Sequence, residues 1–442
     1  MTRKLSRRHF LGGAAAGALL AGLHVNPSRA DQEKAPSEKL NLACVGVGNK
    51  GWDNIEHLKS QNIVALCDVD TRYLGAAATA FPKAAQYRDY RKMLDAENNR
   101  IDAVVVSTAD HNHAPATAIA LSLGKHVYCE KPLTHTVKEA RTVAQLAVEH
   151  KLATQMGTQI HAEPNYRRVV EIISGGALGP VREVYTWCNK GWSNGRFKES
   201  DKPAPDSFDW DLWLGPAAKR PYCVDIHPAN WRRFWEFGSG TFGDMAAHIM
   251  DLPFWALNLR HPQRVAASGP EVHPDGTPSW CMAEYDFAPR GDLPAVKLHW
   301  ADGGQHQDLV KNTKDHAGNA LSTWGLGILF VGEKGMLAAD YGHYNLLPQD
   351  KFEGFKPPPK SIADSVGHWN EWVRACKTGE PTTCHFDYAG ALTENILLGV
   401  VAYRSGKTLE WDAKNLKVTN EARANDLLTK EYRKGWEVPG LT

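Results

Sequence analysis

Short apolar runs alternate with helix-length amphipathic segments from about residue 40 to residue 160. Strands that alternate with helices are typical of an open parallel sheet with helices on both faces. We therefore expect a doubly wound α/β domain over residues 41–160. The pattern predicts strands at 42–46, 62–67, 101–107, 126–129 and 153–157, and helices at 49–60, 71–81, 90–96, 114–123 and 137–150.

The pattern changes after residue 160, and residues 161–442 form the second predicted domain. Its strands fit a large, mostly antiparallel open sheet whose free face would pack on helices or on a partner subunit. The long segment 190–237 is rich in Trp, Pro and Gly, and loops of that length are usually functional or disordered; its aromatic content argues against disorder. The predicted strands are 181–189, 282–287, 296–300, 326–331 and 336–340, and the predicted helices are 165–174, 362–378 and 388–405, the last two packing back on the first domain.

The first thirty residues have the features of a targeting signal. The run from Ser6 to Leu11 contains Arg7-Arg8, an apolar segment follows to about Leu23, and small residues surround Ala30. This order predicts a twin-arginine signal peptide over residues 1–30, cleaved near Ala30, with a polar linker over 31–40. Because the apolar segment is too short to span a bilayer comfortably, we expect a periplasmic protein with no membrane attachment after cleavage. A disordered basic N-terminus is the alternative.

Composition narrows the possible functions. The 442 residues carry a formal net charge of +1, so no global field favours nucleic acid or an acidic membrane as a partner. Cysteines such as Cys44, Cys67 and Cys129 lie in apolar runs, as buried small side chains do, and only a pair such as Cys376 with Cys384 stays open as a disulfide. Fifteen Trp suit either a thick core or a cleft in which sugars stack.

A glycine turn directly follows the first predicted strand. Gly46, Gly48 and Gly51 have the spacing at which the first glycine permits a tight turn, the second lets backbone approach a pyrophosphate and the third lets a helix pack closely. Asn49 and Lys50 complete the turn, at a helix N-terminus that favours phosphate. The next strand ends on Asp68, which is placed to accept hydrogen bonds from ribose hydroxyls. The sequence therefore predicts a dinucleotide site.

Polar residues follow three further strands where ligands of open sheets bind. Glu130 and Lys131 follow one of these strands, and Pro132 holds them in place. Charged residues at the end of a strand could form a solvated turn, but their position where a cofactor would lie favours a functional role. Asp110, His111 and His113 could be metal ligands, but no third compact cluster supports a metal, so we predict none and favour hydrogen bonding to the cofactor. The candidate cofactor residues at these exits are Thr108, Asp110, His111, His113, Glu130 and Gln159.

Asp244 and His248 are four residues apart, so a helix would place them on one face. A carboxylate beside an imidazole can orient the ring and favour its charged form. Because glycines precede the pair, a structural role in capping the helix is equally compatible with the pattern.

Together, Gly46-x-Gly48-x-x-Gly51, Glu130-Lys131-Pro132 and Asp244-x-x-x-His248 resemble the glucose-fructose oxidoreductase, inositol dehydrogenase and MocA family (Gfo/Idh/MocA). The resemblance covers essentially the whole mature chain. It implies a Rossmann domain, a C-terminal α/β domain with a large open sheet, and a homo-oligomer that is a dimer or a tetramer. It further implies that Lys131 contacts the reacting hydroxyl, that His248 is the general acid/base and that Asp244 orients it or binds substrate. Ala109 and Ala246 stand where relatives commonly have Pro and Gly, which affects loop geometry more than chemistry.

These residues predict hydride transfer between a nicotinamide and a hydroxyl-bearing carbon of a carbohydrate or cyclitol. Asp68 would repel a 2′-phosphate, so NAD is favoured over NADP, although Arg72 keeps NADP open. Export implies a tightly bound cofactor, which favours a second possibility: a glycoside hydrolase with a redox-neutral cycle of oxidation, elimination, hydration and reduction. A binding protein that retains its nucleotide without catalysis is a third. The candidate substrate residues are Asn165, Trp231, Arg232 and Arg233.

Overall fold

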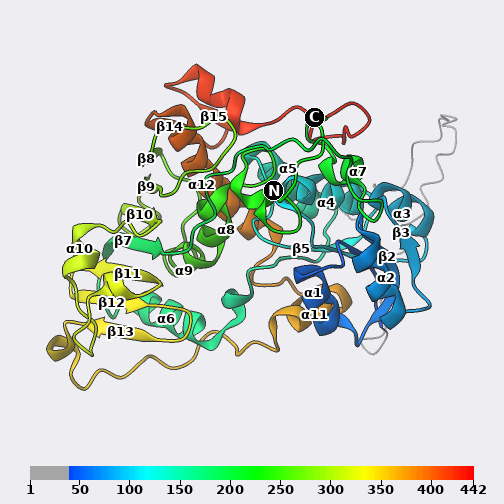
Figure 1. Ribbon diagram of the computed structural model, residues 1–442. Coiled ribbons are helices and arrows are strands. Elements are labelled where there is room, and N and C mark those ends of the chain that lie inside the picture. Colours follow the sequence, from blue (N-terminus) through cyan, green and yellow to red (C-terminus); the bar gives the residue numbers. More distant parts are fainter. Residues whose placement is uncertain (1–38) are drawn as a thin grey trace, which may run out of the picture. The chain divides into compact units, whose positions relative to one another are not determined.

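The computed structural model describes residues 39–442, so the predicted export signal lies outside the described residues. Figure 1 shows the first sheet in blue to cyan and most of the second in green to yellow. The first sheet has six parallel strands in the order β3-β2-β1-β4-β5-β6. Its strands are β1 (Asn41–Val45), β2 (Asn62–Cys67), β3 (Ala85–Tyr87), β4 (Ala103–Val106), β5 (His126–Cys129) and β6 (Thr154–Met156).

Helices connect these strands, and their side-chain caps explain where several begin. The Asp70 and Asp89 side chains accept from the backbone N–H two residues later, and Thr136 forms a reciprocal capping box with Glu139. The helices are α1 (Lys50–Leu58), α2 (Thr71–Ala80), α3 (Tyr90–Glu97), α4 (His113–Ser122) and α5 (Val137–Glu149). The predicted doubly wound domain is confirmed, and the missed strand β3 is only three residues long.

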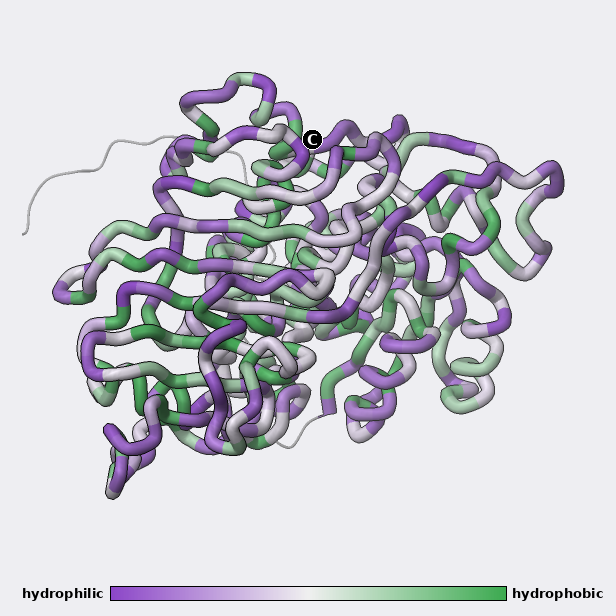
Figure 2. Tube along the Cα trace, turned by 60° about the vertical axis from the view of Figure 1, so that its left-hand side comes forward, coloured by the Kyte–Doolittle hydropathy of each residue, from purple (hydrophilic) through white to green (hydrophobic). Residues whose placement is uncertain are grey.

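The second sheet has nine strands in the order β13-β12-β11-β7-β10-β9-β8-β14-β15. Neighbours are antiparallel except β7 and β10, which confirms a mostly antiparallel sheet. Figure 2 shows hydrophilic and hydrophobic residues alternating along these strands, the pattern of a sheet with two different faces. The strands are β7 (Val181–Cys188), β8 (Arg264–Ser268), β9 (Met282–Phe287), β10 (Val296–Asp302), β11 (Leu326–Gly332), β12 (Gly335–Ala339), β13 (Tyr344–Leu347), β14 (Leu409–Asp412) and β15 (Lys417–Val418).

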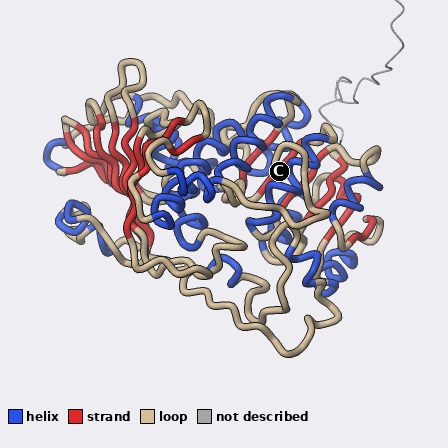
Figure 3. Tube along the Cα trace, turned by 90° about the horizontal axis from the view of Figure 1, so that it is seen from above, coloured by secondary structure: helices blue, strands red, loops and turns tan. Residues whose placement is uncertain are grey.

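Helix α12 (Phe386–Ser405) joins the two sheets. It is buried on nearly all sides, and it packs on α5 as well as on β8 and β9. Arg141 of α5 donates to the buried Glu394 of α12 in an ion pair with a closest distance of 2.7 Å. Figure 3 shows helices between the two groups of strands. The other helices here are α6 (Pro164–Ser174), α7 (Trp210–Leu214), α8 (Gly240–Ile249), α9 (Asp251–Ala256), α10 (Asp308–Asn312) and α11 (His368–Thr378).

The predicted helix over 362–378 is wrong at its start. Helix α11 begins only at His368, because Gly367 has a φ of 98° and lies outside helical conformation. The sequence also missed strands β8, β13, β14 and β15, which are short or lie at or near an edge of the sheet. Segment 190–237 contains only α7 and the 3-10 turn Asn230–Arg233 as helices, in keeping with the irregular loop expected.

Two global features concern cysteines and membranes. All eight cysteines are free, including Cys376 and Cys384, and all but Cys376 are buried. Over residues 39–442, no helix combines the length and the apolar character needed to cross a bilayer.

Candidate active site

The glycine turn after β1 is packed so closely that side chains would not fit. A Cβ on Gly51 would lie 2.0 Å from the Gly46 carbonyl oxygen, and one on Gly46, whose φ is 79°, would lie 2.6 Å from the Ser107 carbonyl oxygen. These contacts bring the start of α1 against the ends of β1 and β4, where backbone N–H groups can bind phosphate. The Tyr73 ring lies against Gly48, and Asn49 donates to its hydroxyl at 3.3 Å.

Asp68 lies beside this turn with its carboxylate anchored. Its oxygens accept from the backbone N–H of Val47 at 2.8 Å and of Asp70 at 2.9 Å, while burial raises its pKa. A carboxylate held in this way keeps lone pairs for further donors, as the predicted ribose contact requires. Arg72 is bidentate to Asp70, with N–O distances of 3.0 and 2.6 Å, so its guanidinium is engaged away from Asp68.

A segment of the second domain covers the turn after β2. Thr71 N–H donates to the Ser207 carbonyl at 2.8 Å, and Asp209 N–H donates to the Val69 carbonyl at 3.0 Å. The Phe208 ring stacks on His227, with ring centroids 4.5 Å apart. We call residues 204–231 the clamp. With the glycine turn, the clamp encloses a cavity of about 210 Å³ whose lining includes Gly46, Asp68, Thr108, Trp213, His227, Trp231 and Arg232.

Lys131 leaves β5 and meets helix α8 of the second domain. Its Nζ donates to the Asp244 carboxylate at 2.6 Å and to the Asp244 carbonyl at 2.9 Å. Arg232 Nε donates to the same carboxylate at 3.0 Å, and Trp192 Nε1 donates to it at 2.9 Å. Although burial alone raises the pKa of Asp244, the charges of Lys131 and Arg232 hold it well below its usual value. Asp244 is therefore a carboxylate anchored by three side chains.

His248 lies one helical turn after Asp244 on α8. Burial, together with the charge of Lys131, lowers its pKa to about 3, so the ring is neutral near pH 7. Its Nδ1 lies 3.3 Å from the Thr158 hydroxyl, and the Tyr341 ring packs edge-on with centroids 6.2 Å apart. A neutral imidazole carries one unprotonated nitrogen and can act as a general base.

Glu130 lies behind Lys131 in a buried hydrogen-bond network. Its carboxylate accepts from Asn54 at 3.0 Å, from Tyr128 at 3.3 Å and from Gln159 at 3.5 Å, and burial raises its pKa. Gly157 leaves room for this side chain, because a Cβ there would lie 2.6 Å from the carboxylate carbon. Lys50 forms an ion pair of 2.5 Å with Asp53 and still lines the cavity.

Several predicted cofactor residues do not line the cavity. His113 lies between two carbonyls, with Nδ1 2.8 Å from Pro132 O and Nε2 3.1 Å from Thr108 O, and so ties two strand exits together. His111 is buried with Nε2 3.0 Å from the Trp213 carbonyl. Burial lowers the pKa of His111 to about 3 and that of His113 to about 4. Asp110 is buried beside the charges of Arg232 and Lys131, and burial raises its pKa to about 8.

The predicted substrate residues divide into two pairs. Trp231 and Arg232 line the cavity, and the Arg232 guanidinium lies 4.1 Å from the Trp231 ring centroid. Asn165 uses both amide protons on the carbonyls of Asp340 and His343, so the structure gives no support for a substrate contact through them. Arg233 does not line the cavity, and its carbonyl accepts from Thr277 instead.

Sequence reasoning missed Trp192, His227 and the contact of Thr158. Trp192 and His227 come from the irregular segment, where composition indicated a functional loop but no periodicity could single out a position. Over residues 39–442, no group of three or more His, Cys, Asp or Glu side chains is placed to hold a metal ion.

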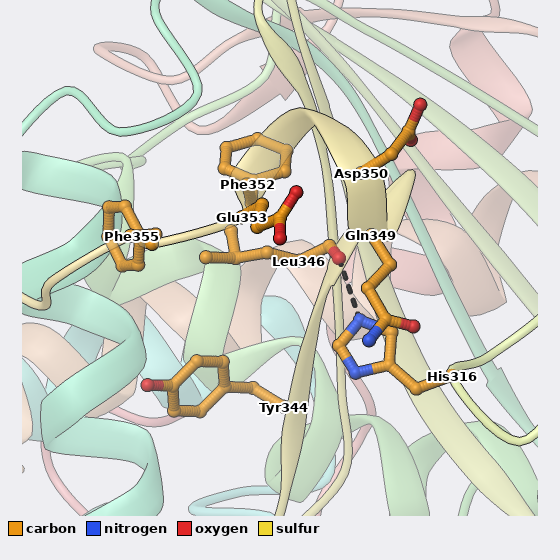
Figure 4. Close-up of a pocket in the computed structure, with 9 residues that line it drawn as sticks. His316, Tyr344, Leu346, Gln349, Asp350, Phe352, Glu353 and Phe355 are labelled. Atoms are coloured by element: carbon orange, nitrogen blue, oxygen red, sulfur yellow. Dashed lines mark hydrogen bonds between the residues drawn. The ribbon is translucent and has the colours of Figure 1, made fainter.

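A second, wider pocket lies at the edge of the large sheet. Figure 4 shows its lining residues, most of which come from β13 and the turn after it. His316 also lines it, and its Nε2 donates to the Leu346 carbonyl at 2.9 Å. Its volume is about 830 Å³, but none of the candidate site residues lines it. Candidate residues such as Gly46, Asp68 and Arg232 line the smaller cavity instead. Lys131, Asp244 and His248 are not among its lining residues, and Arg232 links the cavity to them through its hydrogen bond to Asp244.

Comparison with known proteins identifies the family. Residues 40–158 match the model of an oxidoreductase family with an NAD-binding Rossmann fold, and residues 172–294 match the C-terminal alpha/beta domain of the same family. The two matches cover more than half of the chain. The chain belongs to the Gfo/Idh/MocA oxidoreductase family and carries its NAD-binding domain.

Individual relatives share part of the chain. An inositol 2-dehydrogenase of Rubrobacter xylanophilus is 31% identical over 151 residues, which are 33% of this chain and 43% of the relative. A glycosyl hydrolase family 109 protein of Shewanella pealeana is 30% identical over 209 residues, which are 40% of this chain and 44% of the relative. The matches thus span less than half the length of these relatives.

Solved structures share the fold over most of the chain. An inositol dehydrogenase homologue from Azotobacter vinelandii, complexed with NADH and myo-inositol, has a TM-score of 0.56 at 17% identity and covers 85% of this chain and 98% of its own. A levoglucosan dehydrogenase in complex with NADH has a TM-score of 0.55 at 16% identity and covers 84% of this chain and 98% of its own.

Proposed function

We propose that the protein is an NAD-dependent dehydrogenase that acts on a hydroxyl-bearing carbon of a sugar, glycoside or cyclitol. The observation that carries this proposal is that Lys131, at the exit of β5, lies 2.6 Å from the carboxylate of Asp244, which is one helical turn before His248 on α8. The relatives named inositol 2-dehydrogenase and levoglucosan dehydrogenase are consistent with this substrate class.

An alcohol gives up a hydride readily only as its proton leaves, so the site needs a base and a group that stabilises the alkoxide. His248 is neutral and takes the proton from the substrate hydroxyl. Lys131 stabilises the charge that develops on the oxygen, and Asp244 holds its ammonium in place. Bound NAD supplies the hydride acceptor, and the chain orients the substrate toward it.

The glycine turn fits this cofactor because a Cβ at Gly46 or Gly51 would fill the space that backbone and phosphates need. Asp68 favours NAD over NADP, since its carboxylate would repel a 2′-phosphate. Arg72 does not offset this preference, because its guanidinium is paired with Asp70.

We further propose that the cofactor is tightly retained. The cavity of about 210 Å³ is smaller than the roughly 300–1,000 Å³ of typical ligand sites, so the clamp or the Tyr73 ring must move to admit a dinucleotide. Two backbone hydrogen bonds hold the clamp to the turn after β2, which would slow exchange. A retained cofactor agrees with the proposed export of the folded protein to the periplasm.

Export and assembly are proposals of their own. Arg7-Arg8 supports the twin-arginine route, and replacing both by Lys should leave the protein in the cytoplasm on fractionation.

The face of the large sheet opposite α12 carries half-buried Tyr185, Val331 and Met336, which supports a dimer or tetramer through this face. Light scattering on the purified protein measures that state.

The deciding experiment combines cofactor recovery with a substrate panel. Denaturing the purified protein should release stoichiometric NAD(H), identified by absorbance and mass. Adding myo-inositol, aldoses or 1,6-anhydro sugars to the holoenzyme should then reduce the bound NAD, with absorbance rising near 340 nm. No reduction by any polyol, with NAD bound, would contradict the dehydrogenase proposal.

The glycosyl hydrolase relatives favour a second candidate, a redox-neutral hydrolysis that uses the same residues. In that cycle the carbon that is oxidised is later reduced again, so no net NADH accumulates. Release of p-nitrophenol from p-nitrophenyl glycosides without added NAD would support it. Accumulation of NADH without release would favour the dehydrogenase.

A further inference from the structure

The Thr158 hydroxyl lies between two groups of helix α8. Thr158 is fully buried in the turn after β6, and its own N–H donates to the Met156 carbonyl at 2.8 Å. Its Oγ1 is 3.1 Å from the Ala247 carbonyl oxygen and 3.3 Å from His248 Nδ1. The Ala247 carbonyl is in the last turn of α8, where carbonyls lack an intrahelical partner.

Only one arrangement of protons makes both contacts hydrogen bonds. A hydroxyl has one proton to donate, and a carbonyl oxygen can only accept. The Thr158 proton therefore goes to the Ala247 carbonyl, and the hydroxyl oxygen accepts from His248 Nδ1–H. A neutral imidazole has only one N–H, so the lone pair is then on Nε2.

We infer that Thr158 is a positioning residue that fixes His248 in the Nδ1–H tautomer and leaves Nε2 as the atom that takes the substrate proton. The inference rests on the proposed function for this last step only. Tyr341 packs against the ring by its edge, and Lys131 and Asp244 act on it by charge. Among residues 39–442, none of these three groups forms a hydrogen bond with Nε2.

The same hydroxyl also serves the proton transfer. When the substrate O–H bond breaks, its electron pair stays on oxygen and the proton joins the Nε2 lone pair. The imidazolium then donates from both nitrogens, and its Nδ1–H keeps Thr158 as acceptor. A hydrogen bond to the charged form stabilises that form, which helps a ring whose resting pKa is about 3. The Tyr166 hydroxyl, which donates to the His248 carbonyl at 2.8 Å, holds the end of the helix while this happens.

The test compares Thr158→Val, which removes the hydroxyl at nearly constant volume, with Thr158→Ser, which restores it. Two-dimensional ¹⁵N NMR of histidine-labelled holoenzyme reports the tautomer, with the His248 signal assigned from a His248→Gln sample. We expect Nδ1–H in the wild type and in the Ser variant, and Nε2–H or a mixture in the Val variant. We expect kcat to fall roughly 10- to 100-fold in the Val variant and to recover within several-fold in the Ser variant.

Thr186→Val is the matched control, because Thr186 is also buried and donates to a carbonyl, that of His299, which is not a candidate site residue. It should lose comparable stability and keep its kcat. Nε2–H in the wild type, an unchanged kcat in Thr158→Val, or a Ser variant as impaired as the Val variant would overturn the inference. If no polyol is oxidised, the proposed function fails, while the NMR measurement still decides the tautomer.

Discussion

Lys131 Nζ lies 2.6 Å from Asp244 Oδ1, and this ion pair joins the end of a strand in the parallel sheet to a helix of the second domain. Both side chains are about nine-tenths buried, with 13% and 11% exposed. Arg232 also donates to Oδ1 of this carboxylate, and Trp192 donates to Oδ2. Among the described residues, the polar contacts of Asp244 are thus with cations and an indole, and its effect on His248 is electrostatic.

The position of Lys131 leads to the first prediction. Lys131→Ala should lower kcat at least about 1,000-fold, because the alkoxide loses its cation, while the NAD content of the purified protein stays stoichiometric. Single-turnover reduction of the bound cofactor measures the first quantity, and absorbance after denaturation measures the second.

Lys59→Ala is the control for this substitution, since Lys59 pairs with Glu56 at an exposed position. It should keep wild-type turnover. Undiminished turnover in Lys131→Ala would remove Lys131 from the mechanism.

The anchored carboxylate leads to the second prediction. Asp244→Asn removes the carboxylate that pairs with Lys131 and Arg232, both of them largely buried, and breaking such a buried pair costs about 3–5 kcal/mol of unfolding free energy. Urea unfolding measures this loss. Asp308→Asn, which removes an exposed pair with Lys311, should cost less than about 1 kcal/mol. Equal losses in the two variants would mean that the Asp244 cluster contributes nothing special to stability.

The sequence predicted the parts of the site that follow from local pattern. The turn at Gly46 comes directly after a strand, and Lys131 follows the end of another. Asp244 and His248 have helical spacing. Each of these patterns involves only residues that are near one another in the sequence. Whether a polar side chain then faces a ligand depends on the path of distant chain. Thr108 and His113 both follow β4, yet Thr108 lines the cavity while His113 meets the Pro132 carbonyl instead.

Adjacent residues show the same limit. Arg232 and Arg233 are chemically equivalent in sequence, and only the 3-10 turn at Asn230–Arg233 decides that the first points to Asp244. Trp192 could not be selected among the many tryptophans, because its partner carboxylate is 52 residues away. Long-range placement of this kind comes from packing of the irregular segment, which has no repeating pattern to predict it.

The buried Asp110 leads to a prediction about pH. Burial raises its pKa to about 8, although Arg232 and Lys131 act in the opposite direction. A carboxyl of this kind binds its proton more tightly in the folded state, so its contribution to stability is complete below about pH 4 and is lost as pH rises toward 8. Asp110→Asn should therefore gain stability relative to the wild type between pH 5 and pH 8. Urea midpoints for both proteins over that range test this, and a constant difference would contradict it.

The close contact at Gly51 leads to a fourth prediction. Gly51→Ala would bring a Cβ to 2.0 Å from the Gly46 carbonyl oxygen, so α1 must shift and the phosphate turn opens. We expect loss of bound NAD and a lower melting temperature. Gly75→Ala is the matched control, because Gly75 is in α2 with no atom within 4 Å of the added Cβ, and it should gain about 0.5–1 kcal/mol. Retention of NAD by Gly51→Ala would show that the turn tolerates the shift.

The clamp leads to the last prediction, which concerns cofactor release. The Phe208 ring stacks on His227, and the Phe208 backbone forms a β-bridge with Asp70 beside the turn after β2. Removing the ring should therefore loosen the clamp where it covers the nucleotide turn. We expect Phe208→Ala to release NAD at least about tenfold faster than the wild type, as followed by exchange against labelled NAD.

His227→Ala should act in the same direction with less effect on the core, because its ring is more exposed. Phe355→Ala, in the pocket at the sheet edge, should leave the release rate unchanged. Equal release rates in all four proteins would mean that the clamp does not retain the cofactor, and that a slow step elsewhere, such as movement of the Tyr73 ring, would have to account for retention.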